Sequence, residues 1–204
     1  MNLQKLFKVQ AELDKKIIEE KGLQGQDLLD KKILALQVEL GELANEWRGF
    51  KFWSEDQKAR TKEFCEICCG VGVYIGDDYS VYDPCFRCNG TGFSEKNPLL
   101  EEYVDCLHFI LSIGLELKVK LPYVIGNYEA PNVTRQFSLV FEDISKLDRV
   151  IRNEYEESMI FDIYDETVRG ILGLGRLLGF TGEQIEQAYY EKNKENHERQ
   201  ENGY

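Results

Sequence analysis

The stretch LLEEYVDCLHF, residues 99–109, constrains the fold of this chain more than any other. It places three carboxylates, at Glu101, Glu102 and Asp105, inside a run of large apolar side chains. Burying an ionised carboxylate costs on the order of several kcal/mol unless a cation or a hydrogen-bond donor offsets the loss of hydration. These acids must therefore face either water or a bound metal ion, and the run alone leaves both answers open.

Most of the chain outside residues 60–96 has the hydrophobic spacing of amphipathic helices. Apolar side chains recur at intervals of three and four residues, which is the period of an α-helix. Asn97 followed by Pro98 is a helix start, and Thr181 with Gln184 matches a capping box. We expect helices over residues 2–20, 28–47, 97–119, 134–153, 155–178 and from 181 onward. The sequence therefore predicts an all-α helical bundle.

The composition narrows the partners that the chain can bind. A formal net charge of −12 opposes binding to a nucleic acid backbone, and a small anionic substrate would need a bound cation as a bridge. Nowhere do 18 apolar residues run together, and the N-terminus has no apolar signal segment. We expect a cytoplasmic protein that binds neither membranes nor nucleic acids.

Two copies of the motif CxxCxGxG lie between the second and third predicted helices. Six cysteines in a chain without a secretion signal favour metal ligands or free thiols over disulfides. Paired CxxC turns place four thiolates around one structural Zn²⁺ ion. The predicted zinc ligands are Cys65, Cys68, Cys85 and Cys88. The alternative is a set of free thiols or a redox pair.

Both copies resemble the knuckle repeated in the cysteine-rich domain of J-domain co-chaperones. We predict that residues 60–96 form a small zinc-binding subdomain, inserted into a helical domain made of residues 1–59 and 97–204. The two remaining cysteines, Cys69 and Cys106, are expected to pack as small apolar side chains.

Two pairs of acids at a three-residue spacing predict a second metal site. The pairs are Glu39 with Glu42, and Glu102 with Asp105. Residues three apart share one helix face, so two antiparallel helices would bring all four acids together. Hard divalent cations such as Mg²⁺ or Mn²⁺ would relieve their repulsion. The alternative is that each pair lies on a solvated face.

A di-iron centre is disfavoured because only one motif of the required type is present, Asp105-x-x-His108. We therefore expect His108 to pack or to form a hydrogen bond.

Four sequence blocks, in order, resemble the dimeric dUTPase family of all-α nucleotide pyrophosphohydrolases. The blocks are VQAELDKKI, VELGELANEWRGFKFW, EEYVDCLHFILSIG and AYYEKNKENHERQENGY. The resemblance implies a homodimeric enzyme that hydrolyses dUTP, and typically dUDP, to dUMP. Two alternatives stay open. One is a pyrophosphohydrolase that acts on another nucleotide, and the other is a zinc-knuckle binding module on a helical scaffold.

The resemblance also implies roles for individual residues. The four acids would hold Mg²⁺ (or Mn²⁺) against the phosphate chain, and Glu39 or Glu42 would help to deprotonate the water that attacks the α-phosphorus. The residues implied as substrate-binding are Lys192, Arg199 and Lys51 for the phosphates, and Asn196, Gln10 and Trp53 for the base. An amide matches the hydrogen-bonding edge of uracil, and an aromatic ring can stack on it.

Overall fold

The computed structural model describes residues 1–75, 82–119 and 128–203 of the chain, and this part contains six helices. They are α1 (Leu3–Glu20), α2 (Leu29–Trp47), α3 (Pro98–Glu116), α4 (Val133–Arg152), α5 (Glu157–Leu177) and α6 (Gly182–Glu201). The only strands in the described residues are a short antiparallel pair, β1 (Val73–Ile75) and β2 (Tyr82–Pro84). The predicted all-α fold is confirmed, although α3 ends slightly before the expected residue 119.

Side-chain caps fix the starts of α3, which contains the acids Glu102 and Asp105, and of α6, which contains the cations Lys192 and Arg199. At α3, the Asn97 side chain accepts a hydrogen bond from the backbone N–H of Leu100 at 3.2 Å. At α6, the Thr181 hydroxyl accepts from the Gln184 N–H at 3.2 Å, while the Gln184 side chain accepts from the Thr181 N–H at 2.9 Å. Each cap satisfies backbone donors that the first helical turn leaves unpaired.

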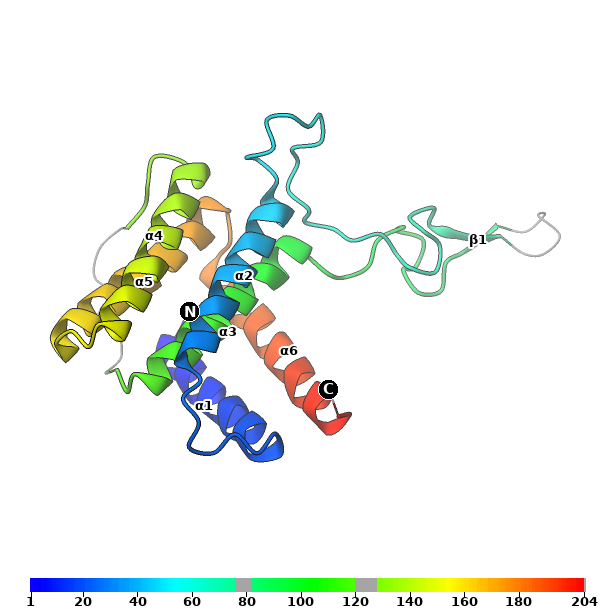
Figure 1. Cartoon of the computed structure of the whole chain (residues 1–204). Helices are drawn as coiled ribbons and strands as arrows, with labels where there is room; N and C mark the ends of the chain where they lie inside the picture. The colour runs from blue at the N-terminus through cyan, green and yellow to red at the C-terminus, as the bar shows by residue number, and fades with distance from the viewer. Residues whose placement is uncertain (76–81, 120–127, 204) are drawn as a thin grey trace.

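Helix α3 lies at the centre of the bundle and contacts α1, α2, α5 and α6 (Figure 1). Its apolar side chains are buried, including Leu107, Ile110 and Leu111. The Tyr164 hydroxyl of α5 donates to the Ile110 carbonyl at 3.0 Å and lies directly over Gly114, where any Cβ atom would overlap it. Because α3 is covered on most sides, its few polar residues must face other helices.

The segment between α2 and α3 leaves the bundle (Figure 1), and it contains all the cysteines except Cys106. Its two arms are joined by backbone hydrogen bonds from Leu99 to Arg60 at 3.0 Å and from Ser94 to Glu63 at 2.9 Å. Residues 76–81 of this segment lie outside the described part. The assignment of residues 60–96 as a separate subdomain stays a prediction.

Within the described ranges, we find no helix with the length and apolarity that a membrane crossing requires.

Candidate functional site

Three of the four predicted acids form a compact cluster between α2 and α3. Glu39, Glu102 and Asp105 each offer one carboxylate oxygen, and these oxygens lie within 4.8 Å of one another. Glu102 and Asp105 share a face of α3 because they are three residues apart. Glu42, the fourth predicted acid, is outside this closest group, but its charge acts on both Glu39 and Glu102. All three clustered side chains are partly buried.

The environment of the cluster disfavours negative charge. Burial, and then repulsion from Asp105 and Glu42, raises the pKa of Glu39 to about 7. The same causes raise the pKa of Glu102 to about 7. Burial also raises the pKa of Asp105, against the opposing effect of the Lys192 ammonium. Partly buried oxygen ligands that repel one another suit a hard divalent cation.

Lys192 of α6 supplies positive charge at the edge of the cluster. Its Nζ lies 2.7 Å from Glu101 Oε1 and 2.8 Å from Asp105 Oδ2. The Lys192 side chain is only 10% exposed, so these two carboxylates hold the ammonium largely out of solvent. Lys192 therefore contacts one of the four predicted acids, Asp105. It also pairs with Glu101, which was not predicted.

A cavity of about 350 Å³ opens beside the acids, between α1, α3, α6 and the start of α2. Four of the predicted substrate residues line it: Gln10, Lys192, Asn196 and Arg199. Glu39 and Asp105 form part of the same wall, and the apolar side chains of Leu13, Ile17, Ile18, Leu28 and Phe109 form another part. Acids, cations, an amide and an apolar surface thus surround one space.

Gln10 is a buried residue of the cavity wall, and it orients His108. Its Oε1 accepts from the Tyr189 hydroxyl at 2.5 Å and lies 2.7 Å from His108 Nδ1, while its Nε2 donates to Asp14 Oδ1 at 2.7 Å. Because the carboxylate of Asp14 can only accept, the amide orientation follows. His108 Nδ1 must then carry the proton.

His108 consequently presents an unprotonated Nε2. Burial, and then the charge of Lys192, lowers the His108 pKa to about 3, so the ring is neutral near pH 7. Its Nε2 is buried and has no hydrogen-bond partner in the described part of the chain, and His108 lines the cavity. The sequence predicted a packing or hydrogen-bonding residue, and both parts are confirmed, since the ring also stacks on Tyr189 at 4.1 Å. The free acceptor was not foreseen.

Two predicted substrate residues lie outside the cavity. Trp53 is 66% exposed and packs edge-on against Phe50 and Phe52. The Lys51 ammonium lies 5.6 Å from the centre of the Phe50 ring. Both residues belong to the turn region after α2, where the chain leaves the bundle. Within one copy of the chain, the structure does not bring them to the other site residues.

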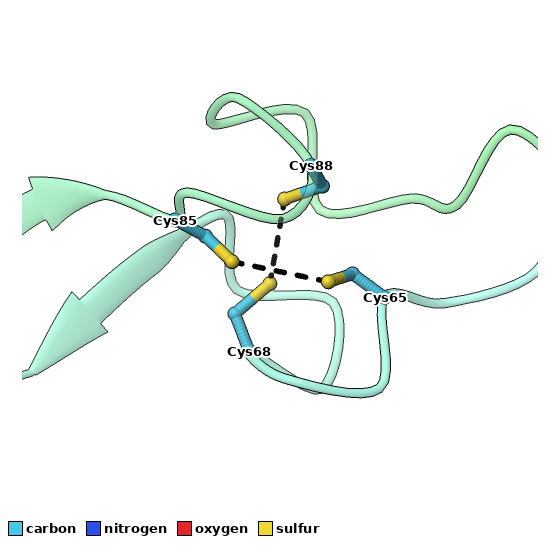
Figure 2. Close-up of side chains that lie close together, drawn as sticks. All are labelled: Cys65, Cys68, Cys85 and Cys88. Carbon is cyan, nitrogen blue, oxygen red and sulfur yellow. Dashed lines mark hydrogen bonds between the residues drawn. The ribbon is translucent and has the colours of Figure 1, made fainter.

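The four predicted zinc ligands converge on one point (Figure 2). Their sulfur atoms lie within 4.8 Å of one another, with 3.8 Å between Cys65 and Cys85 and 3.7 Å between Cys68 and Cys88. All four side chains are buried. Four buried thiolates in this arrangement are typical of a closed structural zinc site.

Glycines allow the two knuckles to interlock. Gly72 and Gly92 have positive φ values of 80° and 79°, and their N–H groups donate to Cys68 Sγ and Cys88 Sγ at 3.3 Å. A Cβ atom on Gly72 would lie 2.5 Å from the Gly90 carbonyl oxygen, so a side chain cannot be accommodated there. Of the two spare cysteines, Cys106 is buried as predicted. Cys69 is exposed, so the packing prediction was wrong for it, because the knuckle turns its side chain outward.

The sequence profile described as dUTPase matches residues 2–67 and 88–204, which is most of the chain. The chain belongs to the dUTPase family. This confirms the resemblance drawn from the four sequence blocks, and it makes the protein a dUTP diphosphatase. Comparison with curated proteins gave no match.

The family assignment fits the site of this dUTPase. The family implies a divalent metal and dUTP as substrate, and the carboxylate cluster beside the cavity has the oxygen ligands that such a cation needs. The profile skips residues 68–87, which lie within the cysteine insert and include two of the four thiolates. The acids and the cavity therefore belong to the matched part of the chain, whereas only half of the four-cysteine site does.

Proposed function

We propose that this dUTPase binds Mg²⁺ at Glu39, Glu102 and Asp105, with Glu42 completing the set, and hydrolyses dUTP to dUMP and pyrophosphate. One observation carries the proposal: the carboxylate cluster borders a cavity whose wall also contains Lys192 and Arg199. A triphosphate needs a cation on one side and ammonium or guanidinium groups on the other. We expect Mn²⁺ to substitute for Mg²⁺, since both prefer oxygen ligands.

The residues of the chain divide the work on the substrate. A bound divalent cation neutralises the charge that develops on the phosphoryl oxygens. We assign Lys192 and Arg199 to the phosphate oxygens, and Glu42 or Glu39 to accept the proton of the attacking water at a carboxylate oxygen. The oxygen of that water bonds to the α-phosphorus, and pyrophosphate leaves. We propose that dUDP reacts at the same phosphorus and releases phosphate.

We propose that His108 reads the uracil base together with Asn196. The N3–H group of uracil is a donor, and the neutral His108 ring offers a buried acceptor at Nε2 without a partner among the described residues. Cytosine has an acceptor at the same position, so its lone pair would face that of the histidine. In this proposal Gln10 fixes the ring and does not itself read the base.

The position of the broken bond can be tested with isotopically labelled water. Turnover of dUTP in H₂¹⁸O with Mg²⁺ should place one ¹⁸O atom in dUMP and none in pyrophosphate, as measured by mass spectrometry. This outcome is expected because the water attacks the α-phosphorus. Label found in the inorganic product would mean that attack occurs at the β-phosphorus, and would refute the assignment of the acids to the α-phosphate.

We further propose a homodimer and a cytoplasmic location. The exposed Trp53 and the half-buried Lys51 remain candidate substrate residues in such a dimer, where light scattering should give twice the mass of the chain. A site of four thiolates requires a reducing compartment, because oxidation to disulfides would destroy it.

We propose that the four-cysteine site binds one structural Zn²⁺ and that this zinc is separable from catalysis. Replacing Cys65 and Cys88 by Ser should remove the metal and loosen the insert, since a site this small takes its folding energy largely from the ion. Metal analysis should fall from about one zinc per chain to none. The helical circular dichroism should persist, because the bundle has its own core. Zinc that persists in this variant, but is lost from a Glu39→Gln variant, would mean that the two metals are assigned to the wrong sites.

A further inference from the structure

Lys192 has two anionic partners, and only one of them belongs to the carboxylate cluster. Its ammonium lies 2.7 Å from Glu101 and 2.8 Å from Asp105, which are four residues apart on one face of α3. Asp105 is grouped with Glu39 and Glu102, and it lines the cavity. Among the described residues, Glu101 belongs neither to that group nor to the cavity lining. Glu101 therefore binds the Lys192 ammonium from outside the acid group and outside the cavity lining.

The two carboxylates respond differently to a divalent cation in the cluster. A divalent cation bound by Asp105 would compete with the Lys192 ammonium for the negative charge of that carboxylate. The two cations would also repel each other across a few ångströms of a partly buried site. Without another partner, Lys192 would have to compete for Asp105 or leave. Glu101 already lies at hydrogen-bond distance, so the ammonium can stay at the cavity wall when Asp105 is engaged.

Arg199, the other cation of the cavity, has a different anchor. Its guanidinium donates to Glu195 Oε1 at 2.6 Å, one turn earlier on α6. The charges of Arg199 and Lys96 also act on Glu101, but the hydrogen bond to Glu101 comes from Lys192. The hydrogen bond from Lys192 thus connects Glu101 to the cavity wall.

We propose that Glu101 is a positioning residue, which keeps Lys192 at the cavity wall and so lets Asp105 serve the divalent cation. The inference rests on the proposed function, because it presupposes that the cluster binds such a cation. Glu101 contacts neither the phosphates nor the metal in this account. We expect its effect to pass through the hydrogen bond to Lys192, and this dependence can be measured.

A double-mutant cycle read by Mn²⁺ binding tests the dependence. The variants are Glu101→Gln, Lys192→Met and the pair together, and free Mn²⁺ is measured by electron paramagnetic resonance without nucleotide. Glu101→Gln should weaken Mn²⁺ binding about tenfold, the scale of one charged hydrogen bond, since Lys192 then depends on Asp105 alone. Lys192→Met should tighten Mn²⁺ binding. In the Lys192→Met background, adding Glu101→Gln should change the affinity by less than about twofold.

A matched control variant and a kinetic measurement distinguish two effects of Glu101: positioning Lys192, and adding negative charge near the site. Glu46→Gln removes an acid of α2 whose partner is Arg60 and should leave Mn²⁺ binding within about twofold of the wild type. Glu101→Gln should raise the KM for dUTP more than it lowers kcat, and Glu101→Asp, which keeps the charge, should restore part of both the Mn²⁺ affinity and the KM. If circular dichroism shows that the Glu101→Gln variant does not fold, the same measurements on the Glu101→Asp variant test the inference.

Two outcomes would overturn the inference. If Glu101→Gln weakens Mn²⁺ binding equally with and without Lys192, Glu101 acts as a plain negative charge. If it has no effect in either background, Lys192 needs no second partner. Failure of the proposed function would look different, because the wild-type protein itself would then bind no Mn²⁺.

Discussion

Replacing Asp105 by Asn should lower kcat for dUTP by about a thousandfold or more, with the helical fold intact. The substitution removes a charged oxygen from the cluster with Glu39 and Glu102 and also takes one partner from Lys192. Stabilisation of phosphoryl charge by a bound cation is worth several kcal/mol, and about 4 kcal/mol corresponds to a thousandfold in rate. Glu42→Gln should have an effect of the same order. Steady-state kinetics with saturating Mg²⁺ measure both.

Glu102→Gln distinguishes loss of function from loss of fold in this experiment. Burial raises the pKa of Glu102 to about 7 from an ordinary value of 4.5, so the folded protein resists ionisation. Below pH 4.5, Glu102 is protonated in both the folded and the unfolded protein, so the wild type is as stable as a variant with a neutral side chain. As the pH rises toward 7, only the unfolded protein ionises, and this stability of the wild type is lost. In metal-free buffer the Gln variant should melt at a higher temperature than the wild type at pH 8, with little difference at pH 4.5, while its turnover falls. Retained Mg²⁺-dependent activity in the Asp105 and Glu42 variants would sink the assignment of the acids.

The preference for dUTP over dCTP should reach roughly 10⁴ in kcat/KM, because a site built to pair one base edge leaves its polar groups unpaired with the other. The acceptor at His108 Nε2 matches the N3–H of uracil and opposes the N3 lone pair of cytosine. His108→Leu should lose about a hundredfold or more of this preference, mainly through a lower kcat/KM for dUTP. Competition assays with both nucleotides measure the ratio directly.

A conservative change beside Tyr189, the residue whose ring stacks on His108, serves as the control for this result. Tyr190 is 38% exposed and does not line the cavity in the described structure, so Tyr190→Phe should leave the ratio within about threefold. Equal kcat/KM for dUTP and dCTP in the wild type would contradict the uracil-reading role. The other nucleotide specificity left open by the sequence would then be the better account.

Local patterns predicted the helices, the convergence of the four cysteines and the grouping of three of the four acids. Periodicity and caps depend on residues within a few turns of one another, which explains the accurate starts at Pro98 and Gly182. The spacing CxxCxGxG predicted a convergence of thiolates because each half of such a site is formed by one short turn. The acids were predicted as pairs for the same reason, since each pair shares one helix.

Interactions between distant segments could not be predicted in the same way. Gln10 was expected to read the base, and that role stays a prediction, but its hydrogen bond with His108, 98 positions away, was not foreseen. Nothing in the sequence distinguished Glu101 from the other acids of its run, because its partner Lys192 lies on α6 and contacts it only in the folded protein. Exposure was equally hidden, because neither Trp53 nor Cys69 differs in sequence context from a buried residue. In each case the deciding contact depends on how helices and turns pack, not on the residue itself.

The Mg²⁺ dependence of pyrophosphate release from dUTP tests the central claim most directly, namely that the acids of α2 and α3 bind the cation that makes the cavity catalytic. Purified protein stripped of divalent ions should release no pyrophosphate from dUTP, and titrated Mg²⁺ should restore release in a saturable manner. The same titration should fail to restore release in the Asp105→Asn variant while succeeding in the Cys65→Ser, Cys88→Ser variant. Pyrophosphate release that is independent of added Mg²⁺ in the stripped enzyme, or that survives in the Asp105→Asn variant, would contradict the account.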